Sequence, residues 1–234
     1  MPLVVGANAV GVRVTAQDGT TIQAYTLTIT RAPSAVATLS GLSLSSGTLS
    51  PAFSGGTTSY TSAVANSVSS IKVTPKTTDT TATVKVNGVP TASGTASTSI
   101  SLVVGIITIN VLVTAQDGTT TKAYTVKVTR AKSSDATLSG LVVKTATLSP
   151  AFKPAKTAYS ATVPLAVKSV KIKATAANDA AKIKINGTAV ASGSLSKALP
   201  LDFGENLIKI LVTAQDGTTK ATHSADSATL HRPN

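Results

Sequence analysis

The chain has 234 residues, of which only 3% are aromatic, and it contains no cysteine. The missing cysteine excludes a disulfide scaffold and a thiolate metal site, and no apolar run is long enough for a membrane-spanning helix. The net charge of +12 favours anionic neighbours, and it is uneven, since residues 132–220 hold twelve lysines against five acidic residues.

The sequence is periodic. One eight-residue string, Val-Thr-Ala-Gln-Asp-Gly-Thr-Thr, begins at Val14, Val113 and Val212, at a constant offset of 99 residues. The same offset relates Tyr60 to Tyr159. A fixed period without slippage indicates an array of one structural module, and here the array is cut at both ends.

Residues 1–32 correspond only to the last two strands of a module, which form a hairpin. Apolar residues alternate with polar or small residues along both strands, as expected for strands with one buried face. The apolar set is Val10, Val12, Val14, Tyr25, Leu27 and Ile29. A lone hairpin is marginal in water, so this face needs a partner sheet.

Residues 33–131 form the one complete module. The alternation predicts seven short strands, at 39–44, 59–64, 71–73, 84–86, 100–102, 107–113 and 124–128. Asn87-Gly88 and 116–119 are expected turns. Regular turns and the lack of a helical period predict an all-β fold, built from tandem immunoglobulin-like antiparallel β-sandwiches with about seven strands per 99-residue unit.

Residues 132–220 are expected to form a second β-sandwich that lacks its final strand. The offset places this strand at 223–227, where the chain reads His-Ser-Ala-Asp-Ser and the apolar alternation is gone. Residues 221–234 are therefore interpreted as an aberrant tail. A sandwich without its last strand has an open edge that can accept another strand.

Several landmarks resemble those of the bacterial cadherin-like β-sandwich repeat, an immunoglobulin-like module of secreted and surface proteins. They are 49–53 with Tyr60, Val86-Asn87-Gly88, 113–118 with Tyr124, and Thr129-Arg130. The resemblance covers 34–131 fully, 133–219 nearly fully and 3–32 as a terminal fragment. It implies an extracellular or surface module that acts as a spacer, in adhesion or facing carbohydrate. Residues 1–5 do not resemble a signal peptide; an extracellular location remains compatible with this, since an export signal can lie on a longer parent chain.

The two irregular ends have three interpretations. They can result from a fragment or decayed gene whose tail is read out of frame. Alternatively, the hairpin of one chain completes the open sandwich of another, which gives a head-to-tail filament. In the third interpretation, the hairpin packs on the 33–131 sandwich of its own chain.

No residue is predicted to bind a metal ion or a cofactor. Calcium needs six to eight oxygen ligands, usually from several carboxylates. Asp18, Asp117 and Asp216 each stand alone before a glycine, so they are interpreted as turn residues.

No catalytic residue is predicted either. His223, Ser224 and Asp226 have the composition of a catalytic triad, but a triad needs a rigid frame and an oriented base. Glu205 is the only glutamate, which excludes a pair of glutamates for glycoside hydrolysis.

Four lysines form a candidate patch for an anionic ligand: Lys171, Lys173, Lys182 and Lys184. They alternate with apolar residues on two strands that are neighbours in sequence, so each pair faces outward. If the two strands pair, all four ammonium groups lie together. The patch is then either a solvated face or a surface that captures an anionic glycan or a membrane surface. It has no aromatic residue for stacking single-stranded nucleic acid.

These observations predict a non-enzymatic structural repeat module of a bacterial extracellular or cell-surface protein, with a spacer or adhesion role. A self-assembling filament subunit joined by strand complementation is one alternative, and an anionic glycan-binding module is another. The expected partners are the chain itself, head to tail, and an anionic polysaccharide or cell surface. No specific nucleic acid, membrane span or cofactor is expected.

Overall fold

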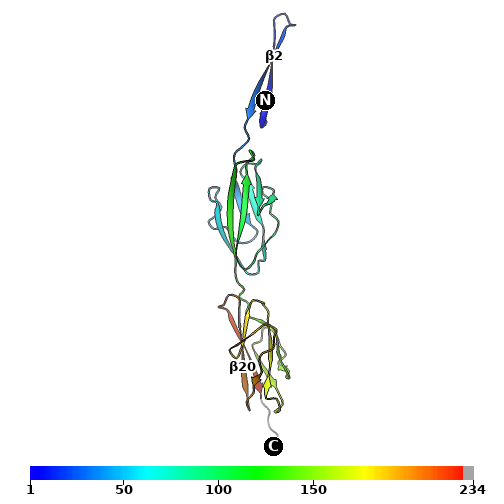
Figure 1. Cartoon of the computed structure of the whole chain (residues 1–234), viewed down its shortest axis with the longest axis vertical. Helices are drawn as coiled ribbons and strands as arrows, with labels where there is room; N and C mark the ends of the chain where they lie inside the picture. Colours follow the sequence, from blue (N-terminus) through cyan, green and yellow to red (C-terminus); the bar gives the residue numbers. More distant parts are fainter. Residues whose placement is uncertain (229–234) are drawn as a thin grey trace. The chain divides into compact units, whose positions relative to one another are not determined.

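The structure is a computed structural model, and it describes residues 1–228 (Figure 1). Every regular element in this range is a β-strand, as the sequence predicts. The described residues include no helix that could cross a membrane. The chain divides into two compact units, Met1–Ala131 and Lys132–Asn234.

The first 32 residues form the predicted hairpin. β1 (Gly6–Thr15) pairs with β2 (Ile22–Arg31) over ten antiparallel residue pairs, with Val12 opposite Tyr25. Tyr25 is 57% exposed and Val12 47%, whereas Tyr124 and Val111, their counterparts in the next module, are both 0% exposed. The apolar face of this hairpin is therefore largely uncovered.

Residues 33–131 form a sandwich. One layer contains a five-stranded sheet in the order β4 (Ser59–Val64), β11 (Thr121–Arg130), β10 (Gly105–Thr114), β7 (Thr83–Val86) and β8 (Val89–Thr91). The opposite layer consists of two short pairs, β3 (Leu39–Leu44) with β6 (Val73–Thr77), and β5 (Ser70–Ile71) with β9 (Ile100–Ser101). The sandwich has nine strands where the sequence predicts seven. The predicted strand at 71–73 is divided between β5 and β6, which pair with different strands, and β8, a three-residue strand after the Asn87-Gly88 turn, is not predicted.

Residues 132–228 repeat this plan. The larger sheet has the order β13 (Leu148–Ser149), β14 (Ala158–Thr162), β21 (Lys220–Ala228), β20 (Asn206–Thr213), β17 (Lys182–Ile185) and β18 (Thr188–Val190). The opposite layer pairs β12 (Leu138–Val143) with β16 (Ile172–Ala176), and β15 (Ser169–Val170) with β19 (Leu199–Pro200).

One pairing in each sandwich departs from the predicted antiparallel pattern. β4 runs parallel to β11, and β14 runs parallel to β21. The alternation of side chains tells which face of a strand is buried, but it carries no information about the direction of the neighbouring strand. Each sandwich is thus antiparallel except where its last strand meets β4 or β14.

The prediction that the second sandwich lacks its final strand is wrong. β21 pairs with β20 over eight residues and with β14 over five. His223 and Ala225 take the places of Tyr124 and Val126 and are buried, being 1% and 2% exposed. Backbone hydrogen bonds from both neighbours hold this strand, so it does not need the apolar alternation on which the prediction relied. The predicted aberrant tail is therefore strand as far as Ala228, and 229–234 lie outside the described residues.

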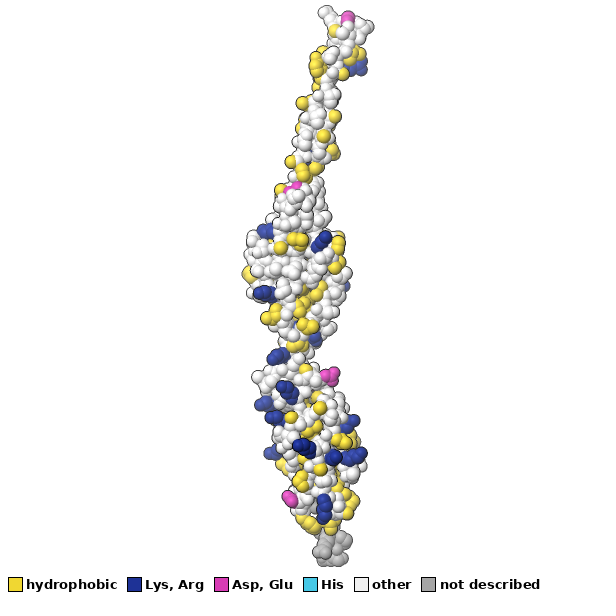
Figure 2. Space-filling view, viewed as in Figure 1, with side chains coloured by type: hydrophobic (Ala, Val, Ile, Leu, Met, Phe, Trp, Pro, Cys, Tyr) yellow, Lys and Arg dark blue, Asp and Glu magenta, His cyan; other side chains and the backbone are white. Residues whose placement is uncertain are grey.

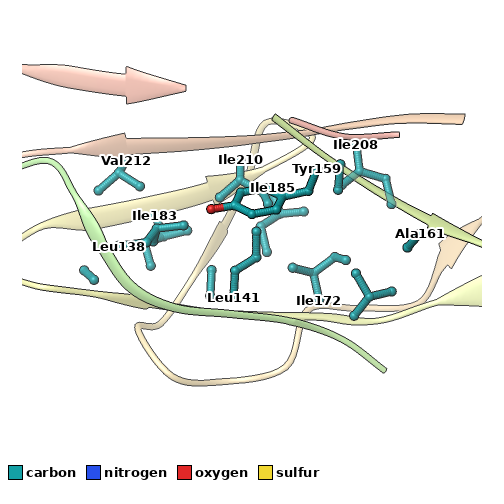
Figure 3. Packing of buried hydrophobic residues seen from close by; sticks show 14 of the residues in the cluster. Leu138, Leu141, Tyr159, Ala161, Ile172, Ile183, Ile185, Ile208, Ile210 and Val212 are labelled. Atoms are coloured by element: carbon teal, nitrogen blue, oxygen red, sulfur yellow. The ribbon is translucent and has the colours of Figure 1, made fainter. Parts of the chain in front are cut away.

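Each sandwich has its own core, and the two clusters share no residue. In the second sandwich, inward-facing residues of both layers meet around Leu138, Ile172 and Ile210, each 0% exposed (Figure 3). Tyr159 stacks on Phe152 with ring centroids 6.0 Å apart, and its hydroxyl donates to the Lys153 carbonyl at 2.7 Å. Aliphatic side chains thus build the core, with tyrosine hydroxyls satisfied by backbone groups.

Candidate functional site

The start of each sandwich is fastened by the repeated Gln-Asp pair. The Ser34 N–H donates to the Gln116 side-chain oxygen at 2.9 Å, and the Asp117 N–H donates to the Ser34 carbonyl at 3.1 Å. Ser133 makes the same two contacts with Gln215 and Asp216, at 2.9 and 3.0 Å. The strict repetition of this string thus serves to tie the incoming chain to the turn before the last strand.

The aspartates of these turns use their carboxylates locally. Asp117 accepts hydrogen bonds from the N–H groups of Thr119 and Thr120 and from the Thr120 hydroxyl. The hydroxyl bond is the main cause that lowers the pKa of Asp117, because it favours the charged form. Asp18 is held in the same way by Thr21, which lowers its pKa to about 2. Among the described residues, no three acidic or histidine side chains gather into a group that could hold a metal ion.

The other end of the first sandwich is fastened by Arg130. Its Nε and Nη2 donate to the Asn66 carbonyl at 2.9 and 2.6 Å, and its Nη1 donates to the Leu102 carbonyl at 2.8 Å. The Asn66 amide in turn donates to the Ala131 carbonyl at 2.9 Å. The guanidinium therefore joins the last strand to two loops where the chain leaves the sandwich.

Replacing Arg130 with alanine is expected to lower the free energy of unfolding of the 33–131 sandwich by about 1.5–3 kcal/mol. The substitution leaves two carbonyls without charged donors, and hydrogen bonds to charged groups contribute about this much. Arg130→Lys should recover only part of the loss, because an ammonium cannot reproduce the fork. Thermal unfolding measures both; a lysine variant as stable as the wild type would contradict the role of the fork.

The predicted four-lysine patch does not exist as one surface. β16 pairs with β12, whereas β17 pairs with β18 and β20 in the other sheet. Lys173 therefore lies on one layer, with Lys171 directly before the same strand. Lys182 and Lys184 lie on the other layer. Alternation correctly predicts that all four are exposed, but β16 and β17 belong to opposite layers although they follow one another in sequence.

Register instead places two other lysines beside Lys182 and Lys184. Lys182 lies opposite Thr213 of β20, and Thr213 lies opposite Lys220 of β21. Lys184 lies opposite Leu211, two residues from Lys209. Lys182, Lys184, Lys209 and Lys220 are all exposed, and they are called the lysine face below. The sequence signal for Lys209 and Lys220 was available, since both alternate with core residues.

The supposed triad residues do not form a catalytic site. His223 points into the core, and its Nδ1 lies 3.2 Å from the Lys156 carbonyl. Its Nε2 is buried and has no hydrogen-bond partner among residues 1–228. Ser224, its neighbour in the strand, belongs to the opposite face. The side chain of Asp226 lies outside the described residues.

The apolar residues of the predicted assembly strands lie on the largely exposed face of the hairpin. The position in the second sandwich that is predicted to accept these strands is already occupied. β21 occupies the position between β14 and β20 that a donor strand would take. Strand complementation of an open second sandwich is therefore ruled out by the fold of that sandwich.

Comparisons with known proteins agree with this architecture. The chain matches the family model of the cadherin-like beta sandwich domain over residues 1–32, 39–131 and 135–225. A putative membrane protein of Evansella cellulosilytica is 44% identical over 89 residues. These residues are 38% of this chain and only 13% of that relative, so the chain spans a small part of its length.

Two solved structures with matching segments are cadherin ectodomains. Drosophila N-cadherin EC1–4 is 12% identical with a TM-score of 0.28; the match covers 74% of this chain and 48% of the cadherin chain. Mouse protocadherin-24 EC1–3 is 14% identical with a TM-score of 0.29; the match covers 97% of this chain and 80% of the protocadherin chain.

Proposed function

Because the chain belongs to the cadherin-like beta sandwich domain family, we propose that it is a non-enzymatic structural module that spaces parts of a bacterial extracellular or cell-surface protein. The observation that carries this proposal is the placement of the two chain ends in each sandwich. A spacer must receive the chain at one end and release it at the other, and it must keep its shape under tension.

In the first sandwich, Ser34 is tied to the turn that precedes β11, and Ala131 follows the far end of that strand. A ten-residue strand is about 33 Å long, so the chain enters and leaves about this distance apart. The second sandwich has the same arrangement, with Ser133 beside the turn before β21. Each sandwich therefore advances the chain by about its own length.

The last strand of each sandwich is also the strand with the most hydrogen-bonded neighbours along its length. β11 pairs with β10 over ten residues and with β4 over six. The hydrogen bonds of the antiparallel β10–β11 pair lie perpendicular to the strands, and those of the parallel β4–β11 pair are slanted. Tension along β11 therefore acts on many bonds at once, and the Arg130 contacts add three more at the exit. This geometry supports a module that resists extension.

Stretching single molecules of the whole chain tests this function. Two unfolding events are expected, each lengthening the chain by on the order of 300 Å, because about one hundred extended residues replace one folded sandwich. Leu138→Ala should lower the force of only one event, which assigns it to the second sandwich. Smooth extension without distinct events would contradict a spacer function.

A further inference from the structure

The lysine face lies on the outer side of the six-stranded sheet, on three adjacent strands. Lys182 and Lys184 are two residues apart on β17, which separates their Cα atoms by about 7 Å. Lys209 is the diagonal neighbour of Lys184, about 7–8 Å away. Lys220 and Lys182 flank Thr213 at a separation of about two strand spacings, close to 10 Å. The four lysines thus form a continuous track.

No described side chain neutralises this track. None of the four lysines forms an ion pair with another described residue. The described outward-facing side chains of β20 and β21 around it are neutral, namely Leu207, Leu211, Thr213, Thr222 and Ser224. Figure 2 shows more lysine and arginine side chains on the second sandwich than on the first.

The first sandwich provides an internal comparison. At the positions that correspond to Lys182, Lys209 and Lys220 it has Thr83, Asn110 and Thr121, and only Lys184 has a basic counterpart, Lys85. The module therefore folds without three of these lysines. Their presence on one face of one sandwich is a property of this copy and not a requirement of the fold.

We propose that the lysine face binds a linear anionic polysaccharide, a property beyond the spacing role. The face is an open sheet surface, so a small anion would meet one or two ammonium groups. A polymer with repeated carboxylate or sulfate groups meets all four, and linked contacts raise the overall affinity. Thr213, Thr222 and Ser224 lie between or beside the lysines and carry hydroxyls that can bond to sugar hydroxyls.

Other polyanions fit the face less well. The described residues of this face include no aromatic side chain on which bases could stack and no arginine that could bind phosphate or guanine with two parallel hydrogen bonds. A membrane would require apolar residues that insert, and among the described residues of this face Leu207, which is 52% exposed, is the only large apolar side chain that is mostly uncovered. Charge complementarity together with a polar, flat surface therefore favours the polysaccharide.

Binding of the full chain to immobilised dextran sulfate tests the proposal, with neutral dextran as the matched uncharged polymer. Binding to dextran sulfate alone is expected, and it should weaken steeply between about 0.05 and 0.15 M salt. The variant K182T/K209N/K220T, which carries the residues of the first sandwich, should bind roughly tenfold more weakly or worse. Its thermal stability should match the wild type, since all three side chains are exposed.

The control variant K144S/K173T/K197T removes the same charge from exposed positions on or beside the opposite layer, again using the residues of the first sandwich. It should retain wild-type binding within about twofold if place and not net charge decides the interaction. Equal losses in both variants, or no binding to dextran sulfate at the lower salt, would overturn the proposal. Tighter binding to phosphatidylserine vesicles or to duplex DNA than to dextran sulfate would overturn it as well.

Discussion

Replacing Leu39 with alanine is expected to lower the free energy of unfolding of the 33–131 sandwich by about 2–5 kcal/mol and to leave the second sandwich unchanged. Leu39 is 1% exposed in the centre of its own core, and its N–H donates to the Tyr124 hydroxyl at 3.0 Å. The alanine leaves a cavity between the two layers, where close-packed neighbours relax only partly. Such a loss is a large part of the stability of a domain of this size.

Hydrogen–deuterium exchange measured on peptides from each sandwich reads the two units separately. Leu39→Ala should speed exchange in β10 and β11 without affecting β20 and β21. Leu138→Ala, at the equivalent position and 0% exposed, should produce the mirror image. Faster exchange in both sandwiches of either variant would show that the units unfold together, against the separate cores seen here.

How much the sequence predicts depends on what periodicity encodes. A period of two identifies the buried face of each strand, so the core around Ile109 and Val111 and the exposure of Lys171 and Lys182 follow from the sequence. The 99-residue offset then transfers each assignment from one module to the next. Local turn chemistry places Asn87-Gly88, where both residues have positive φ.

Pairing between strands is a long-range property that alternation does not contain. Lys173 and Lys184 lie on opposite layers because β16 and β17 join different sheets. The lysine face depends on the register of β17 with β20 and of β20 with β21, which alternation along a single strand does not encode. The Arg130 contacts were likewise hidden, since their acceptors are backbone carbonyls that no residue type marks.

β21 shows a different limit, because the strength of a side-chain pattern is not the same as the presence of a strand. The sequence 223–227 has lost the apolar alternation of its counterpart, yet β21 forms backbone pairs with β20 over eight residues and with β14 over five. Tertiary context therefore fixes this strand despite its polar composition. The polar composition does have one energetic consequence: it places His223, a titratable side chain, inside the core.

Replacing His223 with tyrosine is expected to stabilise the second sandwich by about 1–3 kcal/mol at neutral pH. No described residue forms a hydrogen bond with the buried Nε2 of His223, and an unsatisfied buried polar atom lowers stability by about this much. In the first sandwich, Tyr124 occupies the equivalent position and its hydroxyl accepts the Leu39 N–H. Leu138 is the counterpart of Leu39, so the hydroxyl of the new tyrosine is expected to accept a hydrogen bond from the Leu138 N–H. His223→Phe fills the same volume without a hydroxyl, so it should stabilise the second sandwich less than His223→Tyr does.

The same substitution should remove a dependence of stability on pH. Burial lowers the pKa of His223 below its usual value of 6.5, with the Lys156 carbonyl acting weakly in the opposite direction. Well above pH 6.5 the histidine is neutral in both the folded and the unfolded chain, so its contribution to stability is constant. Below pH 6.5 the unfolded chain takes up the proton first, and the stability of the second sandwich falls by up to about 1.4 kcal/mol per pH unit.

The window between pH 6.5 and 5 isolates this effect. The pKa values of Asp135 and Asp216 are lowered from 3.8 by their threonine partners, so both carboxylates stay charged throughout it. In the first sandwich the pKa of Asp79 is lowered mainly by the Ser34 side chain and that of Asp117 by the Thr120 side chain, so both also stay charged. This sandwich has no histidine and should hold its stability. Hydrogen–deuterium exchange at pH 6.5 and at pH 5 measures the stability of each sandwich. In the wild type the loss of stability at pH 5 should be confined to β20 and β21, and in His223→Tyr it should be absent. A loss that persists in the tyrosine variant would assign the pH dependence to another group and leave His223 as a packing defect alone.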